Sequence, residues 1–404
     1  MNAIQFNPFS PEAQKDPYPQ YKALREAAPV YHSDLLDLWV LSRYEDVSFV
    51  LKDDRFSADR RKATNQLVAQ ARKMQEEGPF AQANTMLSAD PPEHTRLRGL
   101  VSKAFTPRRI EEMRPRIQEI VDGLLGDLNG ETEFDLIEEL SYPLPVIVIA
   151  EMLGIPAEDR ADFKRWSDDL VATLGGPNTP PDALERAMKS GTEMADYFQG
   201  VIAERRKEPK DDLLSAMIAA EERGDVLNEQ ELLATCMLLL AAGNETTTNL
   251  IGNGMLALLR NEDQLDKLLG DPSLMESAVE EMLRYDGPVQ ATARIADADV
   301  EIDGHEIKQG QMLFVLLAAA NRDPAAFPDP ETFDITREDN NHVAFGNGLH
   351  FCLGAPLARI EAQVAFRSLF KRFGKPRLAG DGVEWNANFI LRGPKHLQVA
   401  FEPK

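Results

Sequence analysis

The sequence is poor in cysteine and in basic residues, and it contains no long apolar run. Only two of its 404 residues are cysteines, which excludes a disulfide-stabilised scaffold and favours a reduced, cytoplasmic protein. Asp and Glu number 67 against 44 Lys and Arg, and the net charge of −23 argues against nucleic acid as a partner. The apolar runs, such as 236–242, are far shorter than the roughly 20 residues of a membrane-spanning helix. We therefore expect neither a membrane protein nor a nucleic-acid-binding protein.

The chain nevertheless has enough apolar material for a large core, and most of it has helical periodicity. Hydrophobic residues make up 43% of the chain. No signal peptide, repeat or linker is evident, so we expect a single catalytic domain over 1–404. Helices are predicted over 18–25, 93–105, 107–128, 157–174, 182–206, 229–261 and 272–285. Segments rich in β-strand are predicted over about 35–52, 290–318 and 382–402. The expected fold is mostly α with a smaller β portion.

A glycine-rich loop over 345–354 contains the most informative cysteine, Cys352. Gly346 and Gly348 permit positive φ and close approach of the backbone to a flat ligand. Cys352 precedes a helix predicted from about residue 355, whose N-terminal N–H groups favour a thiolate. A lone thiolate does not form a zinc site, but it suits axial ligation of haem iron. The other members of the motif are Phe345, His350, Gly354 and 357–359.

This loop resembles the haem-binding loop of the cytochrome P450 superfamily, and further motifs follow in the family's order along nearly the whole chain. The resemblance is strongest to soluble bacterial members. It implies haem b with Cys352 as the axial metal ligand, held between the long central helix and the helix that follows the cysteine. It also implies haem contacts from Phe345, Gly346 and Gly354.

The long helix over 229–261 contains the run 242–247, in which Ala242 and Gly243 precede Glu245 and Thr246. A glycine inside a helix costs about 1 kcal/mol relative to alanine, so a local opening with a freed carbonyl is predicted here. The hydroxyl of Thr246 and the carboxyl of Glu245 have the chemistry of a proton relay. The resemblance implies that Ala242 and Gly243 lie against the haem and that Glu245 and Thr246 are catalytic.

The resemblance to the family also implies roles for several charged residues outside these two motifs. Glu281 and Arg284 lie on one helical face and look like the family's core-stabilising pair. The family often adds an arginine where this chain has Thr332, so either Arg322 or Arg337 is the candidate replacement. Buried haem propionates need charged partners, and the resemblance implies four of them: His94, Arg98, Arg294 and His350.

The remaining cysteine, Cys236, and the apolar residues of the candidate pocket are expected in or next to the core. Cys236 is expected in the core, among leucines of the long helix. The resemblance implies a substrate pocket over the haem, with Trp166 and Leu170 as a candidate lid. Its expected walls are mainly apolar and indicate a lipophilic substrate: Met86, Leu87, 238–242, 289–292 and 389–391.

The sequence carries no flavin or nicotinamide motif, so electrons are expected from a separate ferredoxin or flavodoxin with its own reductase. Such partners are typically acidic, and a basic patch on the cysteine side would have to attract them. The candidates are Arg96, Lys103, Arg108, Arg109 and Arg359. A monomer is expected.

The leading hypothesis is a haem-thiolate monooxygenase that hydroxylates or epoxidises a lipophilic small molecule with O2. A second hypothesis keeps the haem but changes the chemistry to peroxide-driven oxidation, desaturation or C–C coupling. The Glu245–Thr246 pair favours the first. A third, a haem-based sensor or carrier, leaves that pair without a purpose.

Overall fold

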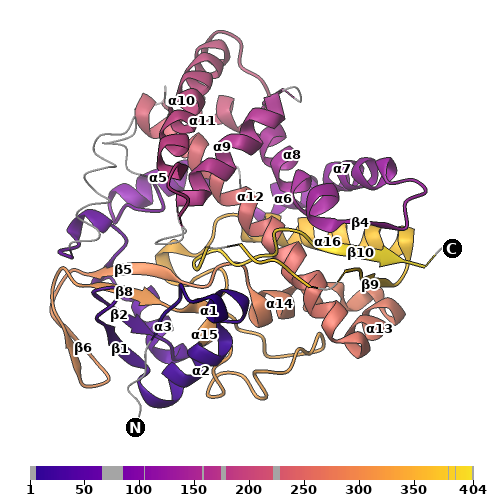
Figure 1. Ribbon diagram of the computed structural model, residues 1–404. Helices are drawn as coiled ribbons and strands as arrows, with labels where there is room; N and C mark the ends of the chain where they lie inside the picture. The colour runs from indigo at the N-terminus through magenta and orange to yellow at the C-terminus, as the bar shows by residue number, and fades with distance from the viewer. Residues whose placement is uncertain are drawn as a thin grey trace.

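Helices account for most of the described chain, and Figure 1 shows them packed beside a smaller β region. The computed structural model describes residues 6–65, 85–103, 105–156, 159–173, 179–221, 228–380, 382–386 and 388–402. The helices are α1 (Pro11–Lys15), α2 (Tyr18–Ala27), α3 (Tyr44–Lys52), α5 (Glu93–Ser102), α6 (Pro107–Glu112), α7 (Arg114–Asp127), α8 (Pro143–Met152), α9 (Arg160–Ala172), α10 (Ala183–Lys207), α11 (Leu213–Glu221), α12 (Glu229–Arg260), α13 (Glu262–Gly270), α14 (Met275–Asp286), α15 (Leu317–Ala320) and α16 (Ala355–Phe373). The prediction of a mostly α fold with a smaller β portion is confirmed.

The described strands form three small sheets. Their orders are β1-β2-β8-β5-β3, β4-β10-β9 and β6-β7, and only the β2–β8 pair is parallel. The bounds are β1 (Val30–Ser33), β2 (Leu38–Leu41), β3 (Phe56–Ser57), β4 (Glu133–Asp135), β5 (Thr292–Ala296), β6 (Val300–Ile302), β7 (His305–Ile307), β8 (Met312–Val315), β9 (Pro376–Leu378) and β10 (Gln398–Phe401). The β6–β7 hairpin turns at Asp303 and Gly304, both at positive φ, as a two-residue hairpin turn requires.

The three predicted β-rich segments agree with the structure to different degrees. Segment 290–318 contains β5 to β8, as expected. Segment 35–52 contains β2, as expected, but the sheet already begins at β1 and α3 occupies the second half of the segment. Segment 382–402 contains β10, while isolated bridges at Trp385–Pro394 and Val289–Leu391 hold its earlier part. Strand pairing with distant residues, which no local pattern reports, decided these boundaries.

The predicted helix over 107–128 is two helices. Pro115 has no N–H to donate and is favoured in a first turn, so α7 starts at Arg114 and α6 ends just before it. Helices α8, α11 and α13 were not predicted. Helix α8 is apolar on nearly every face and shows no 3.6-residue alternation, because most of its side chains are buried.

Helix α12 is the central element and passes through the middle of the molecule (Figure 1). Its start is fixed by the predicted capping box: the Asn228 side chain accepts from the Glu231 N–H, and the Glu231 carboxylate accepts from the Asn228 N–H. It packs against α8, α9, α14 and α16. The largest core cluster is assembled from these helices, and two smaller clusters lie around the five-stranded sheet.

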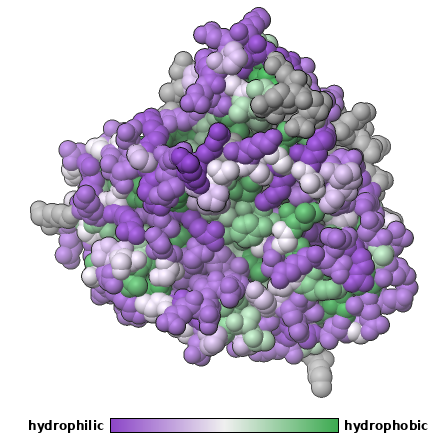
Figure 2. Space-filling view, turned by 180° about the vertical axis from the view of Figure 1, so that it is seen from behind, coloured by the Kyte–Doolittle hydropathy of each residue, from purple (hydrophilic) through white to green (hydrophobic). Residues whose placement is uncertain are grey.

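The surface is mostly hydrophilic, as the charge of the chain predicts. Figure 2 shows hydrophobic residues near the middle of the back face, framed by hydrophilic ones. No helix in the described ranges combines the length and apolar character that crossing a bilayer requires.

Candidate functional site

The cysteine loop is a tight backbone structure that positions Cys352 at the start of α16. The N–H of Cys352 donates to the Phe345 carbonyl at 2.9 Å, and the N–H of Gly346 donates to the Val343 carbonyl at 2.8 Å. Gly346 and Gly348 have φ of +72° and +67°, as predicted. A Cβ at Gly348 would lie 2.4 Å from the Leu51 carbonyl oxygen, so only glycine fits against the end of α3.

The Cys352 side chain is exposed, with Gly354 as the N-cap residue of the following helix. The protein atoms around the sulfur raise the pKa of the thiol. The N–H groups of Gly354 and Ala355 and the charge of Arg98 act in the opposite direction. The start of α16 therefore favours the thiolate, as predicted, and the loss of hydration caused by nearby protein atoms opposes it.

The four predicted propionate partners converge beside this loop. Arg98 on α5 donates to the Phe351 carbonyl at 2.7 Å, next to the cysteine. The rings of His94 and His350 lie 4.3 Å apart between centroids. Arg294, on β5, has its positive charge close enough to lower the pKa of His350, which burial and the neighbouring charges together bring to about 4.

None of these four side chains forms an ion pair with an acidic side chain in the described part of the chain, although the charge of Asp90 acts to raise the pKa of His94, Arg294 and His350. His94 is 1% exposed, and neither of its ring nitrogens has a hydrogen-bond partner. Arg294 is also buried, and among the described residues its guanidinium donates to the Thr292 hydroxyl and the Ala293 carbonyl alone. Burial lowers the pKa of Arg294 to about 10. Buried cations and ring N–H groups without acceptors suit a ligand with two carboxylates, and the donor set therefore fits a haem.

Helix α12 has a group of accessible residues near its middle. Between Glu231 and Leu258, every residue of this helix is buried except one cluster near its middle. The members of this cluster are Leu238, Ala241, Ala242, Gly243, Glu245 and Thr246. A Cβ added to Gly243 would meet no atom within 4 Å, so open space adjoins the helix there. Apolar side chains thus adjoin an acid–hydroxyl pair in this cluster.

The predicted opening of α12 at Gly243 does not interrupt the helix, which is continuous from 229 to 260. Instead, the Thr246 hydroxyl donates to the Ala242 carbonyl at 2.9 Å. A threonine that bonds back to the preceding turn satisfies this carbonyl without breaking the helix, which explains the difference. Thr246 and Ala242 therefore remain adjacent across one helical turn.

The Glu245 carboxylate is half-buried, and its hydrogen-bond partners were not predicted from the sequence. Its Oε1 accepts from the amides of Asn249 and Asn386, each at 3.3 Å. Burial raises the pKa of Glu245, the Asn249 amide opposes this, and the charge of Asp168 adds to it. Asn249 could have been found from its i, i+4 spacing to Glu245. Asn386 could not, because 141 residues separate it from the acid.

The Glu281–Arg284 pair lies in the core, as predicted. Both side chains are fully buried, and Arg284 donates to both carboxylate oxygens of Glu281 at 2.7 Å. Arg337 also contacts Glu281, at 3.2 Å, whereas Arg322 pairs with Glu331 and the Tyr285 carbonyl. The open choice between the two arginines is thus decided for Arg337.

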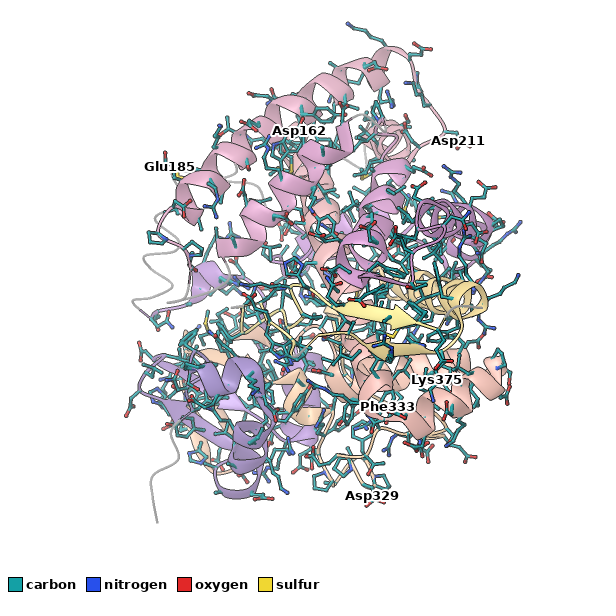
Figure 3. The ribbon with its side chains drawn as sticks, turned by 45° about the vertical axis from the view of Figure 1, so that its right-hand side comes forward. Asp162, Glu185, Asp211, Asp329, Phe333 and Lys375 are labelled. Carbon is teal, nitrogen blue, oxygen red and sulfur yellow. The ribbon has the colours of Figure 1, made fainter. Side chains whose placement is uncertain are left out.

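The Thr332 position that lacks the family's arginine has a backbone role here. The carbonyl of Thr332 accepts from Arg284 at 2.9 Å. In Figure 3, Phe333 of this segment lies toward the helices and Asp329 lies at its outer bend. Phe333 is buried in the core.

Several other expectations can be compared with the structure. Cys236 is buried, as predicted, and burial raises the pKa of its thiol to about 12. Trp166, one of the two candidate lid residues, is buried against Phe163 and donates to Glu193. Leu170 is half-buried against the core.

The predicted basic patch is reduced by three ion pairs. Arg96 pairs with Glu231, and Arg359 with Glu280 at 2.6 Å. Arg359 also lies over the Phe345 ring. Lys103, Arg108 and Arg109 are exposed, and Arg108 pairs with Glu112.

The comparisons with known proteins agree with this geometry. The family model described as Cytochrome P450 matches residues 36–401. The chain therefore belongs to the cytochrome P450 family, and it is a cytochrome P450 monooxygenase. It is 41% identical to the "Polyketide biosynthesis cytochrome P450 PksS" of Bacillus subtilis, covering 99% of both chains. It is 43% identical to the "Vitamin D(3) 25-hydroxylase" of Pseudonocardia autotrophica, covering 98% of this chain and 96% of that one.

The fold has close counterparts among solved structures. The Bacillus subtilis PksS structure superposes with a TM-score of 0.90 at 40% identity, covering 99% of this chain and 100% of that one. A structure of P450BioI in complex with acyl carrier protein ligated to hexadec-9Z-enoic acid has a TM-score of 0.88 at 38% identity, covering 97% and 99%. The predicted family and fold are confirmed.

Proposed function

We propose that this protein hydroxylates or epoxidises a lipophilic small molecule with O2 at the cluster of accessible residues on α12. The observation that carries the proposal is the composition of that cluster. Leu238, Ala241 and Ala242 offer apolar contact, and Glu245 and Thr246 follow on the same part of the helix. Named relatives that act on vitamin D3 or take part in polyketide biosynthesis support a lipophilic substrate class.

The expected pocket walls support this substrate class. Met86, Val289, Ile390 and Leu391 are half-buried, and Leu87 is 62% exposed. Their side chains carry no charge, so burying a polar or anionic group against them is unfavourable. An apolar substrate gains free energy from the area that it removes from water, about 25 cal/mol per Å².

The cofactor in this proposal is haem b, with the Cys352 sulfur as its axial ligand. When bound, haem supplies the binding and activation of dioxygen. Arg98, Arg294, His94 and His350 would hold the two propionates, which accounts for the buried donors without partners. Phe345, Gly346 and Gly354 would line the cysteine side, and Ala242 and Gly243 the opposite side.

Protons in this proposal reach the reaction through Glu245 and Thr246. The Glu245 carboxyl has a raised pKa, which brings it nearer to the range in which it exchanges protons at neutral pH. The Thr246 hydroxyl donates to the Ala242 carbonyl in the resting arrangement. The same hydroxyl has lone pairs that accept a hydrogen bond, so it orients a proton donor at the active face.

Bacterial members of the family use redox partners. We propose that a separate ferredoxin or flavodoxin, with its reductase, supplies the electrons here. Exposed Lys103, Arg108 and Arg109 give a local positive charge against the overall charge of −23. A cytoplasmic location agrees with two cysteines that are both free thiols.

The axial ligand is tested by the carbon monoxide difference spectrum of the reduced protein. A thiolate-ligated Soret band is expected, and Cys352→Ala should abolish it. Cys236→Ala is the matched control, because it removes the other thiol and should leave the spectrum unchanged. An imidazole-type band in freshly prepared protein would contradict the assignment.

The proton relay and the substrate class need separate measurements. Thr246→Ala should lower the fraction of electrons recovered in product and raise peroxide release, and Thr248→Ala, a buried threonine on the same helix, is its control. Unchanged coupling in Thr246→Ala would give this hydroxyl a structural role only.

Lipophilic compounds should perturb the haem spectrum at micromolar concentration, and preferential binding of hydrophilic compounds would contradict the substrate class.

A further inference from the structure

The Glu245 carboxylate is held through only one of its oxygens. Oε1 accepts from both Asn249 and Asn386 at 3.3 Å. Oε2 has no hydrogen-bond partner among the described residues, and it is not one of their buried unpartnered atoms. The two amides therefore fix the orientation of the carboxyl group while one oxygen remains accessible for proton exchange.

Asn386 lies in a hairpin whose two arms are residues 384–386 and 393–395. The Asn386 N–H donates to the Gly393 carbonyl at 2.9 Å, and the Lys395 N–H donates to the Glu384 carbonyl at 2.8 Å. Trp385 and Pro394 form a bridge between the two arms. The backbone of Asn386 is thus positioned by its own hairpin rather than by α12.

The hairpin is docked on α12 at close range. The Asn253 amide donates to the Arg392 carbonyl at 3.0 Å. A Cβ at Gly393 would lie 1.9 Å from Asn249 Oδ1, and a Cβ at Gly252 would lie 3.0 Å from Pro394. Even one additional carbon at either glycine would push the two elements apart. The approach of Asn386 to Glu245 depends on this contact.

The same hairpin carries part of the expected substrate wall. Its tip includes Phe389, Ile390 and Leu391, all half-buried. The Ile390 carbonyl accepts from the Gln290 N–H at 2.8 Å, and Leu391 forms a bridge with Val289. The same hairpin therefore contacts both the expected substrate region and the acid.

We propose that Asn386 is a positioning residue for proton delivery, which orients Glu245 through Oε1 and links its orientation to the substrate-contacting hairpin. This inference rests on the proposed function, in that Glu245 is taken as the proton-delivering acid. Asn386 acts through Glu245 and is not itself a catalytic residue.

The charged and titratable neighbours set the direction of the expected effect. Burial raises the pKa of Glu245, the Asn249 amide lowers it, and Asp168 on α9 raises it. Tyr142, just before α8, also lies within electrostatic reach of Glu245. An amide donor stabilises the carboxylate form, so removing the Asn386 amide should raise the pKa of Glu245 further.

The first test is infrared titration of the Glu245 carboxyl in the purified holoenzyme, with the band assigned by its loss in Glu245→Gln. In Asn386→Leu, which keeps the size but removes the donor, the band should change frequency and the pKa should shift upward. Asn386→Gln keeps an amide and should restore part of the shift. Lys395→Gln, which removes an exposed ion pair from the same hairpin, is the control and should leave the band unchanged.

The second test is coupled turnover with a substrate identified by binding. Asn386→Leu should lower coupling by roughly threefold to tenfold, less than the 10²–10⁴ that general acid–base catalysis itself contributes. If Glu245→Gln leaves coupling intact, the proposed role of Glu245 fails. If Glu245→Gln uncouples the enzyme but Asn386→Leu changes neither the carboxyl band nor the coupling, the role of Asn386 alone is overturned. Circular dichroism and the carbon monoxide spectrum confirm that each variant is folded and loaded.

Discussion

Two groups of buried ionisable side chains in this protein have opposite relations to their surroundings. In the first, Glu281 and Arg284 are fully buried and satisfy each other, with Arg337 and backbone carbonyls completing the set. In the second, Arg294 and His94 are equally enclosed, but no described acidic side chain pairs with either. A complete network holds the fold together, whereas an incomplete one requires a ligand of opposite charge.

The largest loss of stability is expected when one member of the complete network is removed. Arg284→Ala leaves the Glu281 carboxylate buried with Arg337 as its remaining cation, and it should destabilise the fold by about 3–5 kcal/mol. Chemical denaturation or expression yield measures this. Glu281→Gln with Arg284→Met removes both charges and is the matched control, which should recover part of the loss. A fully stable Arg284→Ala protein would contradict the structural role.

The second prediction concerns the incomplete network, where removing a cation should not lower the stability of the haem-free protein. Arg294→Met removes a buried cation without a protein anion, so the stability of haem-free protein should not fall. Haem should dissociate roughly 10–100 times more readily, because a hydrogen bond to a charged group is worth about 1.5–3 kcal/mol. Transfer of haem to an acceptor protein measures this.

The matched control for Arg294 is an arginine whose charge is already neutralised at the surface. Arg55 pairs with Asp53 at 2.7 Å and is exposed, so Arg55→Met should leave haem dissociation unchanged. Equal haem retention in Arg294→Met and the wild type would remove the propionate interpretation for this residue.

The third prediction separates the two arginines near the complete network. Arg337→Ala removes a contact to Glu281 and should cost about 1–2 kcal/mol of unfolding free energy. Arg322→Ala leaves Glu281 untouched, so it should not couple energetically to Glu281→Gln. A double-mutant cycle measures the coupling. Coupling of Glu281 to Arg322 rather than to Arg337 would reverse the assignment.

The fourth prediction uses Glu361, a buried acid that forms no ion pair with any described residue. Burial raises the pKa of Glu361 from 4.5 to about 8, opposed by a hydrogen bond with Thr247. Between these values the folded protein binds a proton that the unfolded chain has released, so stability falls as pH rises through this range. Glu361→Gln should remove this slope, so its stability relative to the wild type should increase as pH rises from about 4.5 to about 8.

Thermal unfolding as a function of pH measures the Glu361 effect. Glu280 offers a contrast, because its pKa is depressed to about 2: burial raises it, but Arg359 and His342 lower it more. Its stabilisation is present above about 4.5 and is lost as pH falls toward 2. Identical pH profiles for Glu361→Gln and the wild type would show that Glu361 is not perturbed by burial.

The smallest effect on stability is expected at the surface. Reversing the charge at both Arg108 and Arg109 should change the unfolding free energy by no more than about 0.5 kcal/mol, because both side chains are exposed. Electron transfer from an acidic partner should slow several-fold at low ionic strength and much less at high ionic strength. Lys189→Glu on α10 is the control. Unchanged transfer rates at low salt would exclude this patch as the docking site.

The sequence predicted most of what depends on local pattern. The bounds of α12 followed from its capping residues, because a cap acts within one turn of the chain. The glycine positions in the cysteine loop followed from the φ values that only glycine adopts without strain. The four propionate partners followed from the family resemblance, and the structure brings them together beside Cys352.

The family, the cysteine loop and the candidate ionisable residues of the site could therefore be predicted from the sequence by itself. Each belongs to a short motif whose residues are close together along the chain. Only the tertiary structure decided that Arg337 rather than Arg322 meets Glu281, and that Asn386 reaches Glu245. Both contacts join residues more than 50 positions apart, and sequence spacing contains no information about such distances. The packing of the C-terminal hairpin against α12, with glycine where any side chain would collide, creates the second contact.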